Sequence, residues 1–164
     1  MVFFVSTETP TMDGGNAQAP WTPTPITSGE WAGWMQWSGD PFELHAGPFY
    51  TRREADGRLI SAFRAEAKHM NGGGFMHGGC LMTFADYALF AIADGAIAGT
   101  SSVTASFNSE FIDAVREGEI VEGSGEVVRA GRSMVFVRGL LTAGGRPVLT
   151  FSAIIKKTPP RPAP

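Results

Sequence analysis

Apolar and polar residues divide the first part of the chain into an irregular leader and a tryptophan-rich segment. Residues 1–28 are rich in Thr, Pro, Gly, Ala and Asn and show no period, which is typical of an extended or disordered leader. In the following stretch, "SGEWAGWMQW", Ser28 can cap a helix that places its three tryptophans largely on one face. We expect this helix either to cover a sheet or to form one wall of an apolar pocket.

The middle of the chain alternates between strand-like and helix-like patterns. Two extended runs within residues 48–69 are separated by Asp56-Gly57, a pair that is typical of a short hairpin turn. The stretch from Gly79 to Ala93 is too long and too rich in Ala, Leu and Met for a strand, and Gly95 suits a helix stop. Because this stretch is apolar on nearly all sides, we expect a helix that is buried all round.

Extended segments then follow one another to the end of the chain, near residues 101–112, 119–129, 132–142 and 147–157. In "VTASFNSEF", alternation predicts that Val103, Ala105 and Phe107, with Ser109 as a further candidate, share one face. A single apolar helix with no partner helix has to be enclosed by a curved sheet. The order therefore predicts an α+β protein with the hot-dog fold, in which an antiparallel sheet wraps around one long central helix.

Composition supports one domain and narrows the partners. The 164 residues carry a formal net charge of −3 with no block of Lys or Arg, which argues against nucleic acid or an anionic membrane as partner. The single cysteine, Cys80, fits a reducing cytosol, and the start "MVFFVSTETP" lacks the basic region of a signal peptide. We expect a cytoplasmic protein with its domain at residues 29–157 and a Pro-rich tail at 158–164.

The glycine-rich turn "NGGGFMHGGC" does not match several well-known motifs. A dinucleotide fingerprint starting at Gly72 would need a glycine where His77 stands. His77-Gly78-Gly79 resembles the oxyanion loop of lipases, but the chain contains no G-x-S-x-G. His69, His77 and Cys80 do not have a recognised zinc spacing, and a lone cysteine on a buried helix is usually a small apolar residue. We therefore expect no metal and no cofactor.

An electrostatic role for the turn remains. The amides at a helix start are unpaired and lie at the positive end of the helix dipole, so those near Gly78 and Gly79 could receive a developing oxyanion. Asp86 lies in the middle of the apolar stretch with no basic residue near it in sequence. It is either a buried carboxylate satisfied by a structural hydrogen bond or a group that activates water or attacks directly.

The same residues resemble a known family. Asn71, Gly74 and His77-Gly78-Gly79, followed by Asp86 nine residues after the histidine, are similar to the pattern of hot-dog acyl-CoA thioesterases of the phenylacetyl-CoA type. The resemblance extends from "DPFELHAGPFY" to Lys157 and includes "VTASFNSEFIDAVREGE" and "RAGRSMVFV". The chain departs from the family at Asp113-Ala114, where Pro-Ala is common.

The resemblance implies a role for each matching residue. Asp86 would be the catalytic carboxylate, as base or nucleophile, and the Gly78 amide would polarise the thioester carbonyl. Asn71 would hold the carbonyl or the water, His77 would order the turn, and Thr104 would position Asp86 or the water. Gly79 and Arg132 are the expected substrate-binding residues, with Arg132 approaching the nucleotide end of CoA. The implied reaction is hydrolysis of an acyl-CoA to a free acid and CoA.

Two other functions remain open for a protein of this kind. A similar fold also serves acyl-thioester hydratases and dehydratases, and a non-catalytic acyl-CoA-binding module is a third possibility. Asp86 lies eight to nine residues from the helix start, which at ~1.5 Å per residue separates the two backbones by roughly 12–13 Å. We therefore expect a homodimer with sites shared between subunits. The resemblance implies further pairing of these dimers into a homotetramer.

Overall fold

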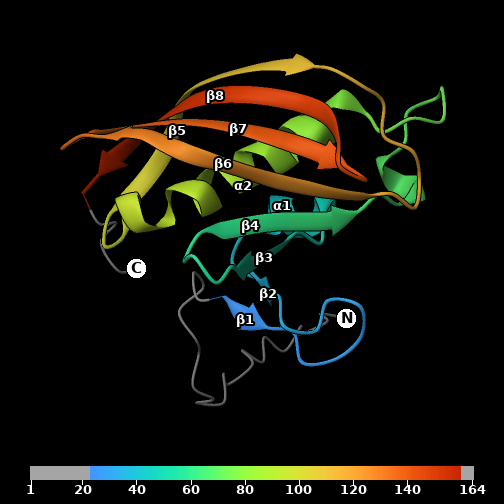
Figure 1. Ribbon diagram of the computed structural model, residues 1–164, viewed down its shortest axis with the longest axis horizontal. Coiled ribbons are helices and arrows are strands. Elements are labelled where there is room, and N and C mark those ends of the chain that lie inside the picture. The colour runs from blue at the N-terminus through green and yellow to red at the C-terminus, as the bar shows by residue number, and fades with distance from the viewer. Residues whose placement is uncertain (1–22, 160–164) are drawn as a thin grey trace, which may run out of the picture.

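One antiparallel sheet and one long helix make up most of the molecule. The computed structural model describes residues 23–159 of the chain. The strands are β1 (Thr24–Pro25), β2 (Met35–Gln36), β3 (Tyr50–Arg53), β4 (Leu59–Arg64), β5 (Ser101–Phe111), β6 (Ile120–Ala130), β7 (Met134–Ala143) and β8 (Arg146–Thr158). The helices are α1 (Pro41–Ala46), η1 (Ala67–His69) and α2 (Gly78–Ile97). The strand order is β1-β2-β3-β4-β6-β7-β8-β5, and α2 lies along the sheet formed by β4 to β8 (Figure 1).

The predicted hairpin and the predicted strands are confirmed. β3 pairs with β4 across a turn in which Gly57 adopts a φ of 86°, a conformation that favours glycine. The four later strands lie within two residues of their expected limits at both ends. One detail of the alternation is wrong, because a bulge shifts the register of β5 between Thr104 and Ser106. Thr104 therefore faces α2, and its neighbour Val103 points away from it.

The central helix is longer than its sequence pattern predicts. It begins one residue earlier than expected and continues through Gly95 to Ile97, so the predicted stop at Gly95 is wrong. Most of its buried side chains pack into the large core under the sheet: Leu81, Phe84, Ala85, Tyr87, Ala88, Leu89 and Ala93. By length and composition alone α2 could cross a membrane, but most of its buried residues belong to this core.

The helix is not surrounded on every side. Asp86, Phe90 and Asp94 follow one another at four-residue spacing and are only partly buried, while Met82, one turn earlier, is 42% exposed. This spacing places the four side chains on one face of the helix. The sheet therefore covers the buried face of α2 and leaves this stripe only partly covered in the single chain. The expectation of burial on all sides is wrong for this stripe.

The tryptophan-rich segment does not form the expected helix. Gly29 and Gly33 have φ values of 78° and 87°, and Ile26 exchanges backbone hydrogen bonds with the Gly33–Trp34 region at 2.8 and 2.9 Å. These glycines turn the chain back on itself, so β1, within the predicted leader, pairs with β2. The nearest helix is α1, which starts after Asp40, whose side chain accepts hydrogen bonds from the backbone of Phe42 and Glu43.

The tryptophans nevertheless cover part of the sheet. Trp34, Tyr50 and Ala62 form a second small core, and the ring of Trp31 stacks on that of Tyr50 at 4.5 Å. Ala62 belongs to this second core whereas its neighbour Phe63 belongs to the large one, so the two cores lie on opposite faces of β4. The expected covering role is therefore confirmed, although the covering segment is a turn and two short strands.

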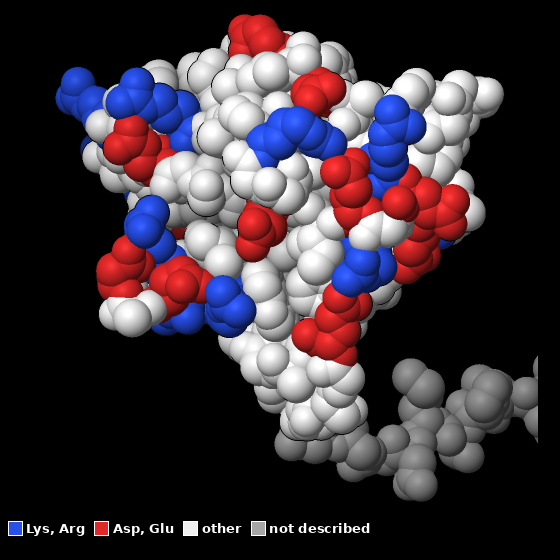
Figure 2. Space-filling view, turned by 45° about the vertical axis from the view of Figure 1, so that its right-hand side comes forward, with Lys and Arg blue, Asp and Glu red and all other residues white. Residues whose placement is uncertain are grey.

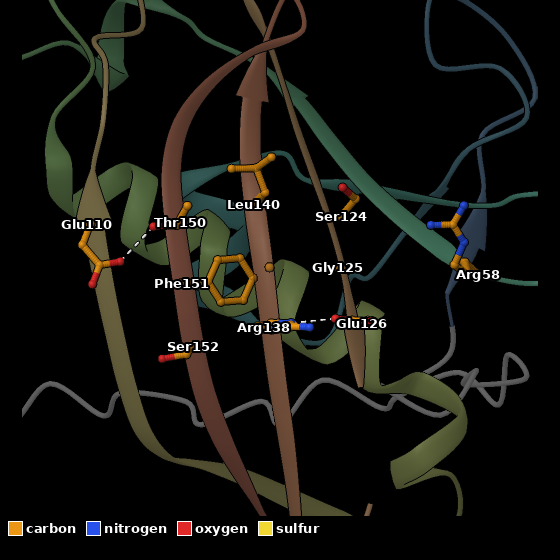
Figure 3. A pocket seen from close by; sticks show the side chains of 11 residues that line it. Arg58, Glu110, Ser124, Gly125, Glu126, Arg138, Leu140, Thr150, Phe151 and Ser152 are labelled. Carbon is orange, nitrogen blue, oxygen red and sulfur yellow. Dashed lines mark hydrogen bonds and ion pairs between the residues drawn. The ribbon is translucent and has the colours of Figure 1, made fainter. Parts of the chain in front are cut away.

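Charged side chains are mixed in sign over the face shown in Figure 2. A hollow of about 580 Å³ lies over β6, β7 and β8, and several of its polar side chains bond to one another (Figure 3). Arg138 Nε donates to Glu126 at 2.6 Å, and the Thr150 hydroxyl donates to Glu110 at 2.8 Å. Because these polar groups already satisfy one another, the hollow is not a strong candidate for chemistry.

Candidate active site

A second cavity, of about 650 Å³, contains Asp86 in its wall. It lies beside the partly covered stripe of α2, which contributes Asp86, Phe90 and Asp94. The remaining walls come from the segment around α1, from the β3–β4 hairpin and from the start of β5. A volume of this size with aromatic and apolar walls is typical of a small-molecule site. Trp37 lines it, so this tryptophan takes the pocket-wall role expected for its segment.

Asp86 is held by one hydrogen bond from the strand next to it. The Thr104 hydroxyl donates to Asp86 Oδ1 at 2.7 Å, which confirms that these two predicted residues lie together. Burial raises the pKa of Asp86, the Thr104 hydrogen bond lowers it, and the nearby charge of Asp40 raises it. The other carboxylate oxygen accepts no hydrogen bond from residues 23–159. Asp86 is thus a partly desolvated carboxylate with one oxygen anchored and one oxygen available as a base or nucleophile.

Two further carboxylates face the same cavity. Asp40 is anchored as the N-cap of α1, and Glu43 lies in the first turn of that helix. Burial, together with the smaller effects of the charges of Asp40 and Asp86, raises the pKa of Glu43 to about 7. These two residues were missed by sequence reasoning, because nothing in "DPFELHA" indicates that this short helix packs beside the middle of α2.

The start of α2 presents one free backbone amide. His77 is the N-cap, and its Nδ1 accepts a hydrogen bond from the Gly79 amide at 2.9 Å. The amides of Cys80 and Leu81 donate to the His77 carbonyl. Gly78 N–H has no acceptor among residues 23–159, and it points along the positive end of the helix. Of the two predicted oxyanion donors, Gly78 is therefore available, and the Gly79 amide is occupied by the cap.

The loop before α2 is tied to itself and to its neighbours. Asn71 Oδ1 accepts from the Gly73 amide at 2.8 Å and from the Phe75 amide at 3.4 Å, which leaves the amide N–H groups of Asn71 as donors. The His77 amide donates to the carbonyl of buried His69 at 2.8 Å. This bond fixes the loop against η1. The loop therefore presents hydrogen-bond donors on a rigid turn.

The predicted site residues fall into two groups in a single chain. Asp86 and Thr104 meet in the middle of α2, whereas Asn71, His77, Gly78 and Gly79 lie at its start and do not line the cavity of Asp86. Arg132 belongs to neither group. It is exposed on the β6–β7 hairpin and makes no ion pair within residues 23–159. Among these residues no cluster of three or more His, Cys, Asp or Glu side chains could hold a metal ion.

Comparisons with known proteins agree on one family. The model of the thioesterase superfamily matches residues 73–150. A Pseudomonas aeruginosa protein named as an esterase is 35% identical over 109 residues, which cover 66% of this chain and 81% of that protein.

Solved structures match a similar share of the chain. A hypothetical thioesterase from Streptococcus pneumoniae, solved with coenzyme A, superposes with a TM-score of 0.64 at 22% identity, covering 72% of this chain and 92% of that one. A mutant of the phenylacetic acid degradation protein PaaI from Thermus thermophilus gives 0.63 at 26% identity, covering 73% and 100%.

Proposed function

This chain belongs to the thioesterase superfamily and is a thioester hydrolase with the hot-dog fold, and we propose that it converts an acyl-CoA to a free carboxylic acid and CoA. The observation that supports this most directly is the pair of half-sites on α2. The free amide of Gly78 suits a thioester oxygen, and Asp86, anchored by Thr104, suits the activation of water.

The proposed reaction uses each half-site for one task. The thioester carbonyl oxygen accepts hydrogen bonds from Gly78 N–H and from the Asn71 side-chain amide, which stabilise the negative charge that develops on it. Asp86 removes a proton from water as the hydroxyl adds to the carbonyl carbon, or alternatively adds to that carbon itself. In the first route the C–S bond then breaks, and the CoA thiolate takes up the proton that Asp86 removed from water. In the alternative the C–S bond breaks to leave a mixed anhydride on Asp86, and water hydrolyses this anhydride, which frees the acid, restores the carboxylate and supplies the proton that the thiolate takes up. His77 orders the turn by capping α2.

We propose that the two half-sites come from different subunits of a homodimer. In the described part of the chain, β5 pairs only with β8 and so is an open edge strand, and Val103 and Phe111 on it are 48% and 54% exposed. The partly covered stripe of α2 lies beside this edge. A two-fold axis there would bring the Gly78 amide of one subunit to Asp86 of the other and would create two equivalent sites.

Several finer expectations accompany this proposal. The resemblance that implies the site also implies that dimers pair into a homotetramer and that Arg132 approaches the nucleotide end of CoA. The single cysteine is consistent with a cytoplasmic location. Burial raises the pKa of Cys80 to about 11, which keeps the thiol protonated and leaves it without a nucleophilic role.

The test is a thiol-release assay over a panel of acyl-CoAs with the wild type and Asp86→Asn. The substitution keeps the size of the side chain but removes its capacity as base or nucleophile. We expect a loss of at least ~10² in kcat, the low end for removal of a general base. Unchanged turnover in a folded Asp86→Asn protein would contradict the mechanism. Hydration of an enoyl-CoA without thiol release would favour the hydratase alternative, and binding without either reaction would favour a binding module.

A further inference from the structure

The cavity beside Asp86 has an unusual balance of charge. Four carboxylates line it, from Asp40, Glu43, Asp86 and Asp94, and none of its lining residues is Lys, Arg or His. Within residues 23–159 only Asp94 among them has a cationic partner, since Arg53 lies 3.0 Å from its Oδ2 at the rim. Three carboxylates are thus left facing one partly enclosed space without a counter-charge.

This charge balance decides which half of an acyl-CoA can enter. The CoA half carries phosphate groups, and a site lined by carboxylates without any basic group repels them. The acyl half is joined to the carbonyl that must lie next to Asp86. If the chain hydrolyses acyl-CoAs as proposed above, the cavity therefore receives the acyl group, and the nucleotide stays outside. Trp37 and Phe90 give the cavity apolar wall for that group.

Glu43 is the carboxylate with the freest side chain in this cavity. Asp40 is fixed by two backbone amides of α1, and Asp86 is fixed by Thr104. The carboxylate of Glu43 accepts no hydrogen bond from residues 23–159. It lies on a helix with no buried residues and lines the cavity, so its charge is directed to the cavity rather than to a structural partner.

We propose that Glu43 is a specificity-determining residue that excludes acyl groups with a negative charge at their far end, so that the enzyme acts on uncharged acyl groups. A second carboxylate brought into the cavity would meet Asp40, Glu43 and Asp86 with no cation to compensate for it. Like charges placed together in this way are a strong element of discrimination. The discrimination between charged and uncharged substrates depends on the acyl half alone. It can therefore be measured separately from the chemistry at the carbonyl.

The ionisation of Glu43 gives the proposal a pH signature. Its pKa of about 7 means that Glu43 gains its charge as the pH rises from 6 to 8. The other titratable groups facing the cavity are Asp40 from the start of α1 and Asp86, Tyr87 and Asp94 from α2. β3 adds the charge of Arg53 at the rim, where it pairs with Asp94, and β4 and β5 contribute no charged residue to the lining. Burial raises the pKa of Tyr87, so it stays neutral throughout this range. Exclusion of anionic acyl groups should therefore be stronger at pH 8 than at pH 6.

The experiment compares hexanoyl-CoA with adipoyl-CoA, which has the same chain length but ends in a carboxylate. In the wild type we expect kcat/KM to favour hexanoyl-CoA by roughly tenfold or more at pH 8, the size of one like-charge contact in a partly hydrated site. Glu43→Gln should lower this ratio severalfold and remove its dependence on pH, and Glu43→Lys should lower it further. Asp86 acts on both substrates, so its own titration cancels in the ratio.

Glu122→Gln is the matched control, because Glu122 is an exposed glutamate on β6 that does not line the cavity. It should leave the ratio unchanged. The proposal would be overturned if the wild-type kcat/KM values for the two substrates differed by less than threefold. It would also be overturned if Glu43→Gln and Glu43→Lys left the ratio of these values unchanged.

Titration calorimetry separates this inference from the proposed hydrolysis. The ligands are the non-hydrolysable thioethers S-hexyl-CoA and S-(5-carboxypentyl)-CoA, which present the same two chain ends. We expect the wild type to prefer the uncharged thioether and Glu43→Gln to lose much of that preference. If neither thioester is hydrolysed but this preference is found, the proposed hydrolysis fails and the charge exclusion stands. Equal binding of the two thioethers, or binding of neither, would overturn the exclusion.

Discussion

The start of α2 and its middle differ in exposure, in the hydrogen bonds that hold them and in the polar groups that they offer. At its start the loop from Asn71 to Gly79 is mostly exposed, is held by hydrogen bonds within itself and to its neighbours, and offers the Gly78 amide and the Asn71 side-chain amide as donors. In the middle, Asp86 is partly buried, is held by a single side-chain hydrogen bond, and offers an acceptor among other acceptors. One region suits a developing negative charge, and the other suits the removal of a proton.

The contrast explains why one chain does not hold a complete site. Unpaired backbone amides occur only at the start of a helix. A carboxylate whose pKa is raised by burial needs the desolvated surroundings that the middle of the helix provides. The two requirements cannot be met at one place on the same helix. Bringing the two regions of different subunits together meets both, and the open edge of β5 supplies a surface for doing so.

The largest effect is expected from removing the amide at the start of α2. Gly78→Pro deletes the N–H, and proline is well tolerated at the first position of a helix. His77 already has φ −64° and ψ 132°, which suits a residue before proline. We expect kcat to fall by ~10²–10³ relative to Gly78→Ala, as for the loss of one oxyanion donor.

Gly78→Ala is the necessary control for that comparison. It keeps the N–H and adds a Cβ that would lie 3.1 Å from the Phe111 ring, and this ring is exposed enough to move. Both variants therefore disturb Phe111, but only the proline variant removes the donor. Equal activity of the two proteins in the thiol-release assay would remove the Gly78 amide from the mechanism.

A smaller effect is expected in the middle of α2. Thr104→Val removes the hydroxyl that lowers the pKa of Asp86, so this pKa should rise. Asp86 acts in its ionised form, and the acid limb of the kcat/KM profile should therefore move to higher pH. At acid pH we expect a roughly tenfold loss, in line with a hydrogen bond to a charged group. Thr104→Ser keeps the hydroxyl and should keep the wild-type profile; a Thr104→Val profile identical to wild type would contradict this role.

The smallest effect concerns stability at the helix start. His77→Ala removes the side-chain acceptor that caps α2, which should cost about 1 kcal/mol. For a domain of this size we expect a fall of about 2–4 °C in melting temperature. Asn is a good N-cap, so His77→Asn should restore most of the loss. If both variants melt together, the cap at His77 is not a stabilising feature.

Local patterns predict much of this fold because its main elements are locally encoded. The Asp56-Gly57 turn and the four long strands follow from turn residues and alternation, and the length of the apolar stretch identifies α2. The pairing of Asp86 with Thr104 was expected from the resemblance. The alternation of residues in β5, however, does not reveal the bulge in that strand. Because of the bulge, Thr104 rather than Val103 faces the helix.

The features that the sequence did not predict depend on contacts between distant segments. The tryptophan-rich segment has helical spacing, but Gly29 and Gly33 with positive φ turn it into a cover for β3 and β4. Glu43 faces Asp86 only because α1 packs beside α2, and no local pattern encodes that packing. The occupied amide of Gly79 likewise depends on the rotamer of His77.

Complementation between inactive subunits tests the shared site most directly. Asn71→Ala disables the start of α2, Asp86→Ala disables its middle, and each protein alone should be nearly inactive. In a mixed dimer, one site carries both changes and the other carries neither. With equal, random reassociation half of the dimers are mixed, so activity should return to roughly a quarter of the wild-type value. If mixed dimers verified by mass spectrometry regain no activity, the two half-sites do not meet across subunits and the account is wrong.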